Sequence, residues 1–142
     1  MHIIDLPFNQ LIGLSVSDNP EYFLMLTNDN KYTNHVKTVH AAALFALAEG
    51  TCGHFLLTNF DGIAENVFPL LRKSEVKYKK PAIGKIYSKV QLVNDTIESF
   101  TTNFIEKSRA IMLLKVDLFD ENGVLVFQGD FEWFVSKVTN SQ

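Results

Sequence analysis

Apolar residues are concentrated in one long stretch of this chain, and elsewhere they alternate with polar residues. Between residues 39 and 57 almost every side chain is apolar or small, which predicts a buried helix at about 40–57. A shorter helix is expected at 6–12. Strands are expected at 14–18 and 22–27, on either side of the turn residues Asp18, Asn19 and Pro20. Further strands are expected at 71–82, where apolar and charged residues alternate, and at 85–93, after the turn at Pro81 and Gly84.

The C-terminal part of the chain contains three further elements. Residues 110–135 alternate over two segments separated by Glu121-Asn122-Gly123, which predicts two long strands joined by a hairpin turn. Within 95–107 the apolar residues recur at helical spacing. Asp95 and Glu98 resemble a capping box, so we expect a short helix in this segment.

Together these elements predict an α+β fold. One apolar helix beside several amphipathic antiparallel strands can be covered only by the sheet that those strands form. We therefore expect an antiparallel sheet of about six strands wrapped around the long helix. No repeat, low-complexity tract or linker-like composition divides residues 1–142, which predicts a single domain.

The composition is that of an ordinary globular protein, with 46% hydrophobic and 20% charged residues. A formal net charge of −3 argues against a nucleic-acid partner, which would require a basic surface.

Cys52 is the only cysteine, so an intrachain disulfide is excluded, as fits a reducing cytoplasm. No signal peptide is expected, because the N-terminus lacks a basic region and Asp5 interrupts the apolar one. Polar residues also interrupt the 39–57 stretch, so we expect a cytoplasmic protein without a membrane partner.

The long helix carries one carboxylate, Glu49, in surroundings that disfavour a charge. No lysine or arginine lies between Thr38 and Asn59, so no neighbour on the helix can pair with it. A carboxylate that is removed from water without a partner has a raised pKa, which brings it toward the range of a general base. The alternative is that Glu49 pairs with a basic residue from a strand, such as Arg72 or Arg109.

The sequence around this acid resembles that of the hotdog-fold thioesterases. Residues 34–53 read NHVKTVHAAALFALAEGTCG, with an asparagine six residues before His40 and an acid nine residues after it. YKKPAIGKI and DENGVLVFQGDFEWFV resemble a strand turn and the closing hairpin of the same family, in the same order along the chain. The alanines after the histidine and the use of Glu rather than Asp place the chain closest to the PaaI-like and DUF4442-like branch of acyl-CoA thioesterases.

The resemblance implies a hotdog fold and a thioesterase acting on acyl-CoA or acyl-carrier-protein substrates, without a cofactor or metal. Glu49 would act as base or nucleophile, and the backbone N–H of Ala41 would polarise the thioester carbonyl, although family members usually have glycine there. Asn34 would orient the water or the carbonyl, unless it only caps its own turn. His40 would meet the acid of a second subunit, because hotdog sites form at dimer interfaces; a purely structural role is the alternative. His35, His40 and Glu49 lack a compact metal-ligand spacing.

Basic residues gather in the segment 72–89, which has seven of the thirteen lysines and arginines and one acid, Glu75. We expect Lys79 and Lys80 to bind the phosphates of coenzyme A or an acidic carrier protein, although a solvated strand face is the alternative. His35 and Phe45 complete the expected substrate-binding residues, with an aryl or medium-chain acyl group running past Phe45. The alternation of this segment predicts that Leu70, Ser74, Val76 and Tyr78 share one face of a strand.

Two other functions remain open at this point. Hotdog dehydratases and hydratases use a histidine and a helical glutamate fourteen residues later, the spacing of His35 and Glu49. Those enzymes carry proline and glycine between the two residues, and VKTVHAAA has neither. The second alternative is a non-catalytic acyl-CoA-binding hotdog dimer, which the alanines in place of the motif glycines favour. A homo-oligomer is expected in each case, and the sequence does not distinguish two chains from four.

Overall fold

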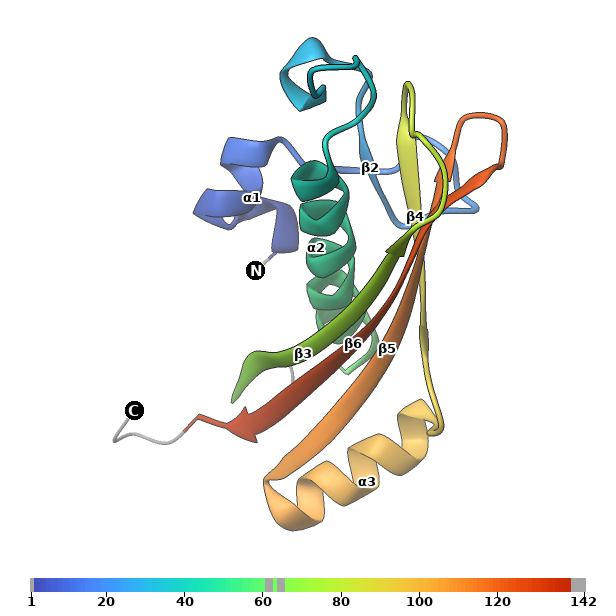
Figure 1. The fold of residues 1–142 in the computed structure, drawn as a ribbon. Helices are drawn as coiled ribbons and strands as arrows, with labels where there is room; N and C mark the ends of the chain where they lie inside the picture. Colours follow the sequence, from blue (N-terminus) through green and yellow to red (C-terminus); the bar gives the residue numbers. More distant parts are fainter. Residues whose placement is uncertain (1, 61–62, 64–65, 139–142) are drawn as a thin grey trace.

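The long apolar helix lies against the concave face of one curved antiparallel sheet (Figure 1). The structure is a computed structural model that describes residues 2–60, 63 and 66–138. The elements in chain order are η1 (Ile3–Asp5), α1 (Pro7–Ile12), β1 (Ser15–Val16), β2 (Leu24–Leu26), η2 (Asn30–Tyr32), α2 (Ala41–Asn59), β3 (Val67–Tyr78), β4 (Ile86–Leu92), α3 (Ile97–Lys107), β5 (Arg109–Asp120) and β6 (Leu125–Lys137). The strand order is β1-β2-β4-β5-β6-β3, and every neighbouring pair is antiparallel. The predicted α+β architecture is confirmed.

The helix α2 is buried because it is apolar on nearly all of its faces. Its length and composition would allow it to cross a bilayer, but 56% of its most apolar window is buried inside this fold. Every second residue of β5 points toward it and is buried, from Met112 to Leu118. Burying each such side chain contributes about 1.5–3 kcal/mol, so the helix and the sheet stabilise one another.

The helix α3 closes one end of the core. Phe100 and Phe104 are its buried residues, and Phe100 meets Phe60, at the end of α2, edge-on with ring centroids 5.1 Å apart. The predicted capping box at Asp95 and Glu98 is wrong. Thr96 is the N-cap, and its hydroxyl accepts the N–H of Ser99 at 3.0 Å.

Leu70 lies on the opposite face of β3 from the one that was predicted. A β-bulge shifts the register between Leu71 and Lys73. Leu70 therefore pairs with the outward-facing Phe134, while Ser74 pairs with the buried Phe131 on the opposite face. The two-residue alternation holds for Ser74, Val76 and Tyr78 but cannot be extended through the extra residue.

A buried hydroxyl pair connects α2 to the sheet. The hydroxyls of Thr51 and Ser88 lie 2.7 Å apart, and both residues are fully buried. The Ser88 oxygen also accepts the N–H of Leu24 at 3.1 Å, and Thr51 bonds the carbonyl of Leu47 at 2.8 Å. Both hydroxyls have hydrogen-bond partners, so burying the pair costs little free energy. The pair also fixes the position of α2 over β2 and β4.

Replacing Ser88 with alanine should lower the free energy of unfolding by about 1–3 kcal/mol, because the Leu24 N–H then loses its acceptor inside the core. Urea unfolding followed by circular dichroism measures the change. Ser136→Ala on β6 is the matched control, because its hydroxyl makes no hydrogen bond with any residue that the structure describes. Equal stability of the two variants would show that the hydroxyl pair contributes nothing.

Candidate active site

Glu49 lies in the middle of α2, half-buried and without a charge partner. Within the described part of the chain, no side chain or backbone N–H donates a hydrogen bond to its carboxylate. The one ion pair among those residues joins Lys85 to Asp18, at 2.9 Å. Arg72 and Arg109, which could have paired with Glu49, are exposed and form no ion pair there. Burial therefore raises the pKa of Glu49.

The carboxylate borders a cavity between α2 and the sheet. The cavity has a volume of about 220 Å³. Its lining residues are Ile3, Leu6, Glu49, Cys52, Gly53, Leu56, Pro69, Met112, Leu114, Trp133 and Val135. Apart from Glu49, the polar atoms available to this lining are the Cys52 thiol and the Trp133 indole N–H. The site thus combines one poorly solvated carboxylate with an apolar chamber.

Cys52 and Trp133 interact with one another. Burial raises the pKa of the Cys52 thiol, and the indole N–H of Trp133 opposes this rise. The indole nitrogen is itself buried and meets no acceptor with hydrogen-bond geometry among the residues described. Because burial is the larger effect on the Cys52 pKa, the thiol stays protonated at neutral pH.

The first turn of α2 leaves one backbone N–H free. His40 is the N-cap, and its Nδ1 accepts the N–H of Ala42 at 3.0 Å. The N–H groups of Ala43 and Leu44 both donate to the His40 carbonyl, at 3.0 and 3.1 Å. Ala41 is an exposed residue, and its N–H has no acceptor within residues 2–60, 63 and 66–138. A free amide at a helix N-terminus is suited to bind a developing negative charge.

The free amide and the carboxylate of one chain are far apart. Ala41 and Glu49 are separated by eight residues of continuous helix. A rise of 1.5 Å per residue places their backbones about 12 Å apart along the axis. A single thioester group cannot reach both in one chain. The same separation keeps His40 away from the Glu49 of its own chain.

Asn34 and His35 belong to the loop that precedes α2. The Asn34 Oδ1 accepts the N–H groups of Val36 and Thr38 at 3.0 and 3.1 Å, and its Nδ2 donates to the Thr38 hydroxyl at 2.8 Å. The amide thus closes its own turn and keeps one N–H for another partner. His35 is exposed, and no described contact brings it to Glu49.

Lys79 and Lys80 follow the end of β3, where both are exposed. The N–H of Val39 donates to the carbonyl of Ala82 at 2.7 Å, which fixes this basic turn beside the N-terminus of α2. Two other lysines of the basic segment interact with neighbouring side chains. Lys85 forms an ion pair with Asp18, and the Lys89 ammonium lies 5.1 Å from the centre of the Tyr22 ring.

Phe45 lies one helical turn before Glu49, half-buried, with its ring centroid 5.6 Å from that of Phe131. It can therefore contact a group that approaches the carboxylate from the N-terminal side of α2. Within the described residues, no three histidine, cysteine or acidic side chains are close enough together to hold a metal ion.

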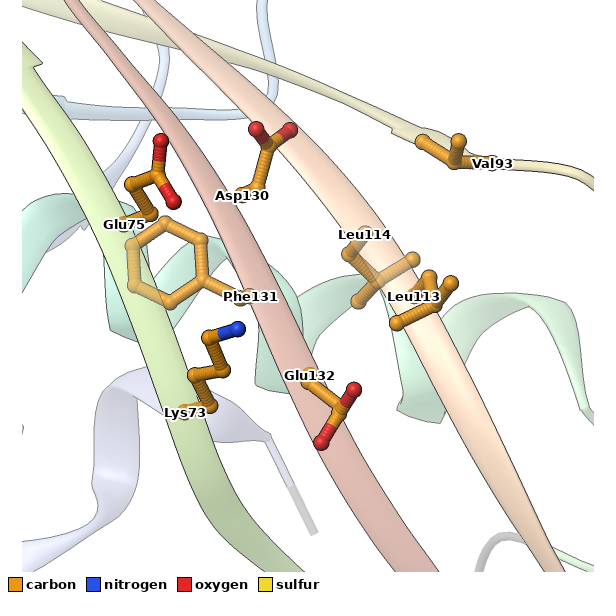
Figure 2. A pocket seen from close by; sticks show the side chains of 8 residues that line it. All are labelled: Lys73, Glu75, Val93, Leu113, Leu114, Asp130, Phe131 and Glu132. Atoms are coloured by element: carbon orange, nitrogen blue, oxygen red, sulfur yellow. The ribbon is translucent and has the colours of Figure 1, made fainter.

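A second hollow, of about 280 Å³, lies over strands β3, β5 and β6, and Glu49 is not among its lining residues (Figure 2). Figure 2 shows four charged side chains above strands β3 and β6, namely Lys73, Glu75, Asp130 and Glu132. Glu75 and Asp130 face one another in register, and like charges in that position repel. These side chains are largely solvated, so the hollow lacks the desolvated acid that distinguishes the cavity at Glu49.

Comparisons with known proteins place this chain in a family. The family described as "Domain of unknown function (DUF4442)" matches residues 13–135. A search of curated proteins finds no significant match. Among solved structures, a protein of unknown function and probable thioesterase from Pseudomonas aeruginosa is 27% identical, with TM-score 0.80 over 96% of this chain and 91% of that chain.

Two more distant structures share the fold. A thioesterase from Haemophilus influenzae is 16% identical, with TM-score 0.73 over 99% of this chain and 90% of that one. A hypothetical thioesterase from Streptococcus pneumoniae, solved with coenzyme A, is 16% identical, with TM-score 0.64 over 88% and 87%. These likenesses confirm the predicted hotdog fold.

Glu49→Gln should raise the melting temperature at neutral pH. Because burial raises the pKa of Glu49 above its ordinary value of 4.5, the folded protein keeps the proton at a pH where the unfolded chain has lost it. The resulting stabilisation is complete below that ordinary value and is lost as pH rises through the folded-state pKa. Glutamine has no charge to desolvate, so the stability of the variant does not decline in this pH range.

Differential scanning calorimetry at about pH 8 and about pH 4 measures this difference. The melting temperatures of Glu49→Gln and the wild type should differ at the higher pH and converge at the lower one. Glu106→Gln, which changes an exposed carboxylate on α3, is the control. A Glu49→Gln variant that melts below the wild type at neutral pH would mean that the carboxylate has a stabilising charge partner.

Proposed function

The chain belongs to the DUF4442 family, and from this premise together with the surroundings of Glu49 we propose that it hydrolyses acyl thioesters of coenzyme A or of an acyl carrier protein. The observation that carries the proposal is an unpaired, half-buried carboxylate at the edge of an apolar cavity. A protein that needed only packing at this position would gain stability from an uncharged side chain. The thioesterase names of its structural neighbours support the same reaction class.

In the proposed reaction Glu49 acts as a general base. It takes a proton from a water molecule while the water oxygen bonds to the thioester carbonyl carbon. The tetrahedral intermediate then collapses, the carbon–sulfur bond breaks, and the departing thiolate receives that proton from Glu49. The raised pKa of Glu49 favours the first transfer, because the carboxylate accepts a proton more readily than an ordinary glutamate. The second transfer is favoured because a thiolate is more basic than a carboxylate.

The negative charge that develops on the carbonyl oxygen needs a donor, and we assign this role to the Ala41 N–H of a second copy of the chain. The separation of about 12 Å along α2 prevents one chain from supplying both groups to one thioester. A two-fold dimer brings the amide of each chain to the acid of the other. His40 then lies beside the shared site. Its Nδ1 accepts the Ala42 N–H, and its Nε2, which bonds no residue that the structure describes, would contact the substrate.

The strand β3 is the surface that fits such a dimer. It spans twelve residues at the edge of the sheet, and no described strand pairs with its outer side (Figure 1). A long unpaired edge is a template for pairing with another chain. Phe68, Leu70 and Tyr78 expose apolar surface on the same strand, which a second copy would cover.

The other residues that the sequence predicted for the site are assigned roles from where they lie relative to the N-terminus of α2. Lys79 and Lys80, beside the N-terminus of α2, are placed to bind coenzyme A phosphates while the thioester lies at the free amide. His35, which is exposed in the neighbouring loop, is proposed to contact the substrate at the same entrance. Phe45 contacts the acyl end, and Asn34 has one remaining amide N–H for the water or the carbonyl.

Purified protein should hydrolyse a panel of acyl-CoA esters, with release of free thiol, and Glu49→Gln should reduce the rate by about 10²–10⁴-fold. In the wild type kcat/KM should decline in acid at a higher pH than an ordinary glutamate would cause, because the base must be deprotonated. Glu106→Gln should behave as the wild type. Affinity for acyl-CoA without turnover would indicate a binding protein, and hydration of enoyl-CoA that requires His35 would indicate a hydratase.

Ala41→Pro should remove the oxyanion donor without disturbing the helix. Proline is favoured at the first helical position, and His40 already has φ −61 and ψ 139, which a following proline requires. We expect kcat/KM to fall by about 10²–10³-fold with an unchanged melting temperature. Ala41→Gly, which keeps the N–H, is the matched control and should retain activity.

Mixing the two inactive variants tests whether the site is shared. After unfolding and refolding together, Glu49→Gln and Ala41→Pro chains form a hybrid dimer with one intact pair of groups, which should restore up to about a quarter of the wild-type activity. A mixture as inactive as its parents would refute a site built from two chains.

A further inference from the structure

The N-terminal segment of the chain is docked directly on the part of α2 that carries the acid. Two glycines on this helix allow the contact. A Cβ atom at Gly53 would lie 2.5 Å from the Ile3 Cδ1, and a Cβ atom at Gly50 would lie 2.6 Å from the Leu14 Cδ1. Glycine lowers helix stability by about 1 kcal/mol relative to alanine, and at these two positions it leaves room for the ends of the Ile3 and Leu14 side chains.

This segment is also anchored by a buried hydrogen bond. The side chain of Asn9, on α1, donates from its Nδ2 to the carbonyl of Ile3 at 2.9 Å, and Asn9 is only 4% exposed. The position of Ile3 is therefore fixed from both sides, by Asn9 and by the groove at Gly53. Ile3 and Leu6 are consequently held in place as one wall of the cavity at Glu49.

The size and chemistry of the cavity restrict what it can hold. A cavity of about 150 Å³ lined by apolar side chains accommodates a benzene molecule. The volume here is about 220 Å³, which leaves room for little more than one ring with one or two further carbons, or a hydrocarbon chain of similar size. Glu49, Cys52 and Trp133 are the only residues of this lining with polar side-chain atoms, and the Trp133 nitrogen and the Cys52 side chain are buried. A polar substituent placed against the apolar remainder would therefore lose its hydration without gaining a hydrogen bond.

We propose that Ile3 and Leu6 form the size-selecting wall of the acyl pocket, which admits unsubstituted hydrocarbon groups of this size and rejects long acyl chains. The inference rests on the proposed hydrolase activity. The family match begins at residue 13, so this wall lies outside the matched segment. Selectivity is thus determined by a part of the chain other than the one that supplies the acid and the free amide.

The test compares kcat/KM for acetyl-, hexanoyl-, phenylacetyl-, dodecanoyl- and palmitoyl-CoA. The wild type should prefer the hexanoyl and phenylacetyl esters. Ile3→Ala, which removes part of the wall, should raise the ratio of dodecanoyl to hexanoyl hydrolysis by about tenfold or more. Leu6→Trp, which fills the pocket from a half-buried position, should lower hexanoyl hydrolysis relative to acetyl hydrolysis by a similar factor.

Leu11→Ala is the control, because Leu11 belongs to the same N-terminal segment but is 77% exposed on α1. Its acyl preference should match that of the wild type. Opposite changes from a smaller and a larger side chain would not arise from a general loss of stability. Unchanged preferences in both folded wall variants would overturn the inference.

A binding measurement separates this inference from the proposed hydrolysis. Thioether analogues of the same coenzyme A esters cannot be hydrolysed, and calorimetry gives their affinities for Glu49→Gln with and without each wall substitution. A protein that hydrolyses no ester but shows the predicted shift in binding preference supports the wall and refutes the hydrolase. Hydrolysis with an acyl preference that neither Leu6→Trp nor Ile3→Ala changes refutes the wall alone.

Discussion

The poor solvation of one carboxylate is the constraint on which the rest of the structure depends. Glu49 lies on a helix without a basic neighbour, against an apolar cavity, and burial raises its pKa. That arrangement costs folding free energy at neutral pH. The cost is small beside the burial of the large side chains of β5 and β6 that enclose the helix, each contributing about 1.5–3 kcal/mol. The sheet that encloses the helix therefore both raises the pKa of this carboxylate and supplies the burial that offsets its cost.

The sequence predicted the fold where one period extends over a whole element. The apolar helix and the 110–135 hairpin were predictable because burial determines which residues they use. Predictions failed where one residue breaks the period. The bulge between Leu71 and Lys73 moves Leu70 to the other face of β3, and the cap of α3 falls on Thr96 rather than Asp95. An inserted residue in a strand and a side-chain cap on a helix are local features that the spacing of apolar residues does not record.

The candidate site was only partly predictable for a related reason. Glu49 stands out in the sequence because a charge interrupts an apolar helix, and the spacing around His40 carried the resemblance to thioesterases. The wall formed by Ile3 and Leu6 was missed, because its contact with α2 joins segments far apart in the chain. Gly53 was the available signal: a glycine inside a helix often marks a close approach of another segment.

The regular geometry of α2 explains why such a site would require two chains. A helix fixes the separation of its free N-terminal amide from an acid eight residues later, and no side-chain rearrangement can close about 12 Å of axial distance. A two-fold axis beside the helix removes the problem, because it places the start of one helix near the middle of the other. The exposed edge of β3 offers the surface for that axis. Oligomerisation would then be part of the catalytic geometry, and a monomer would hold both groups without being able to use them together.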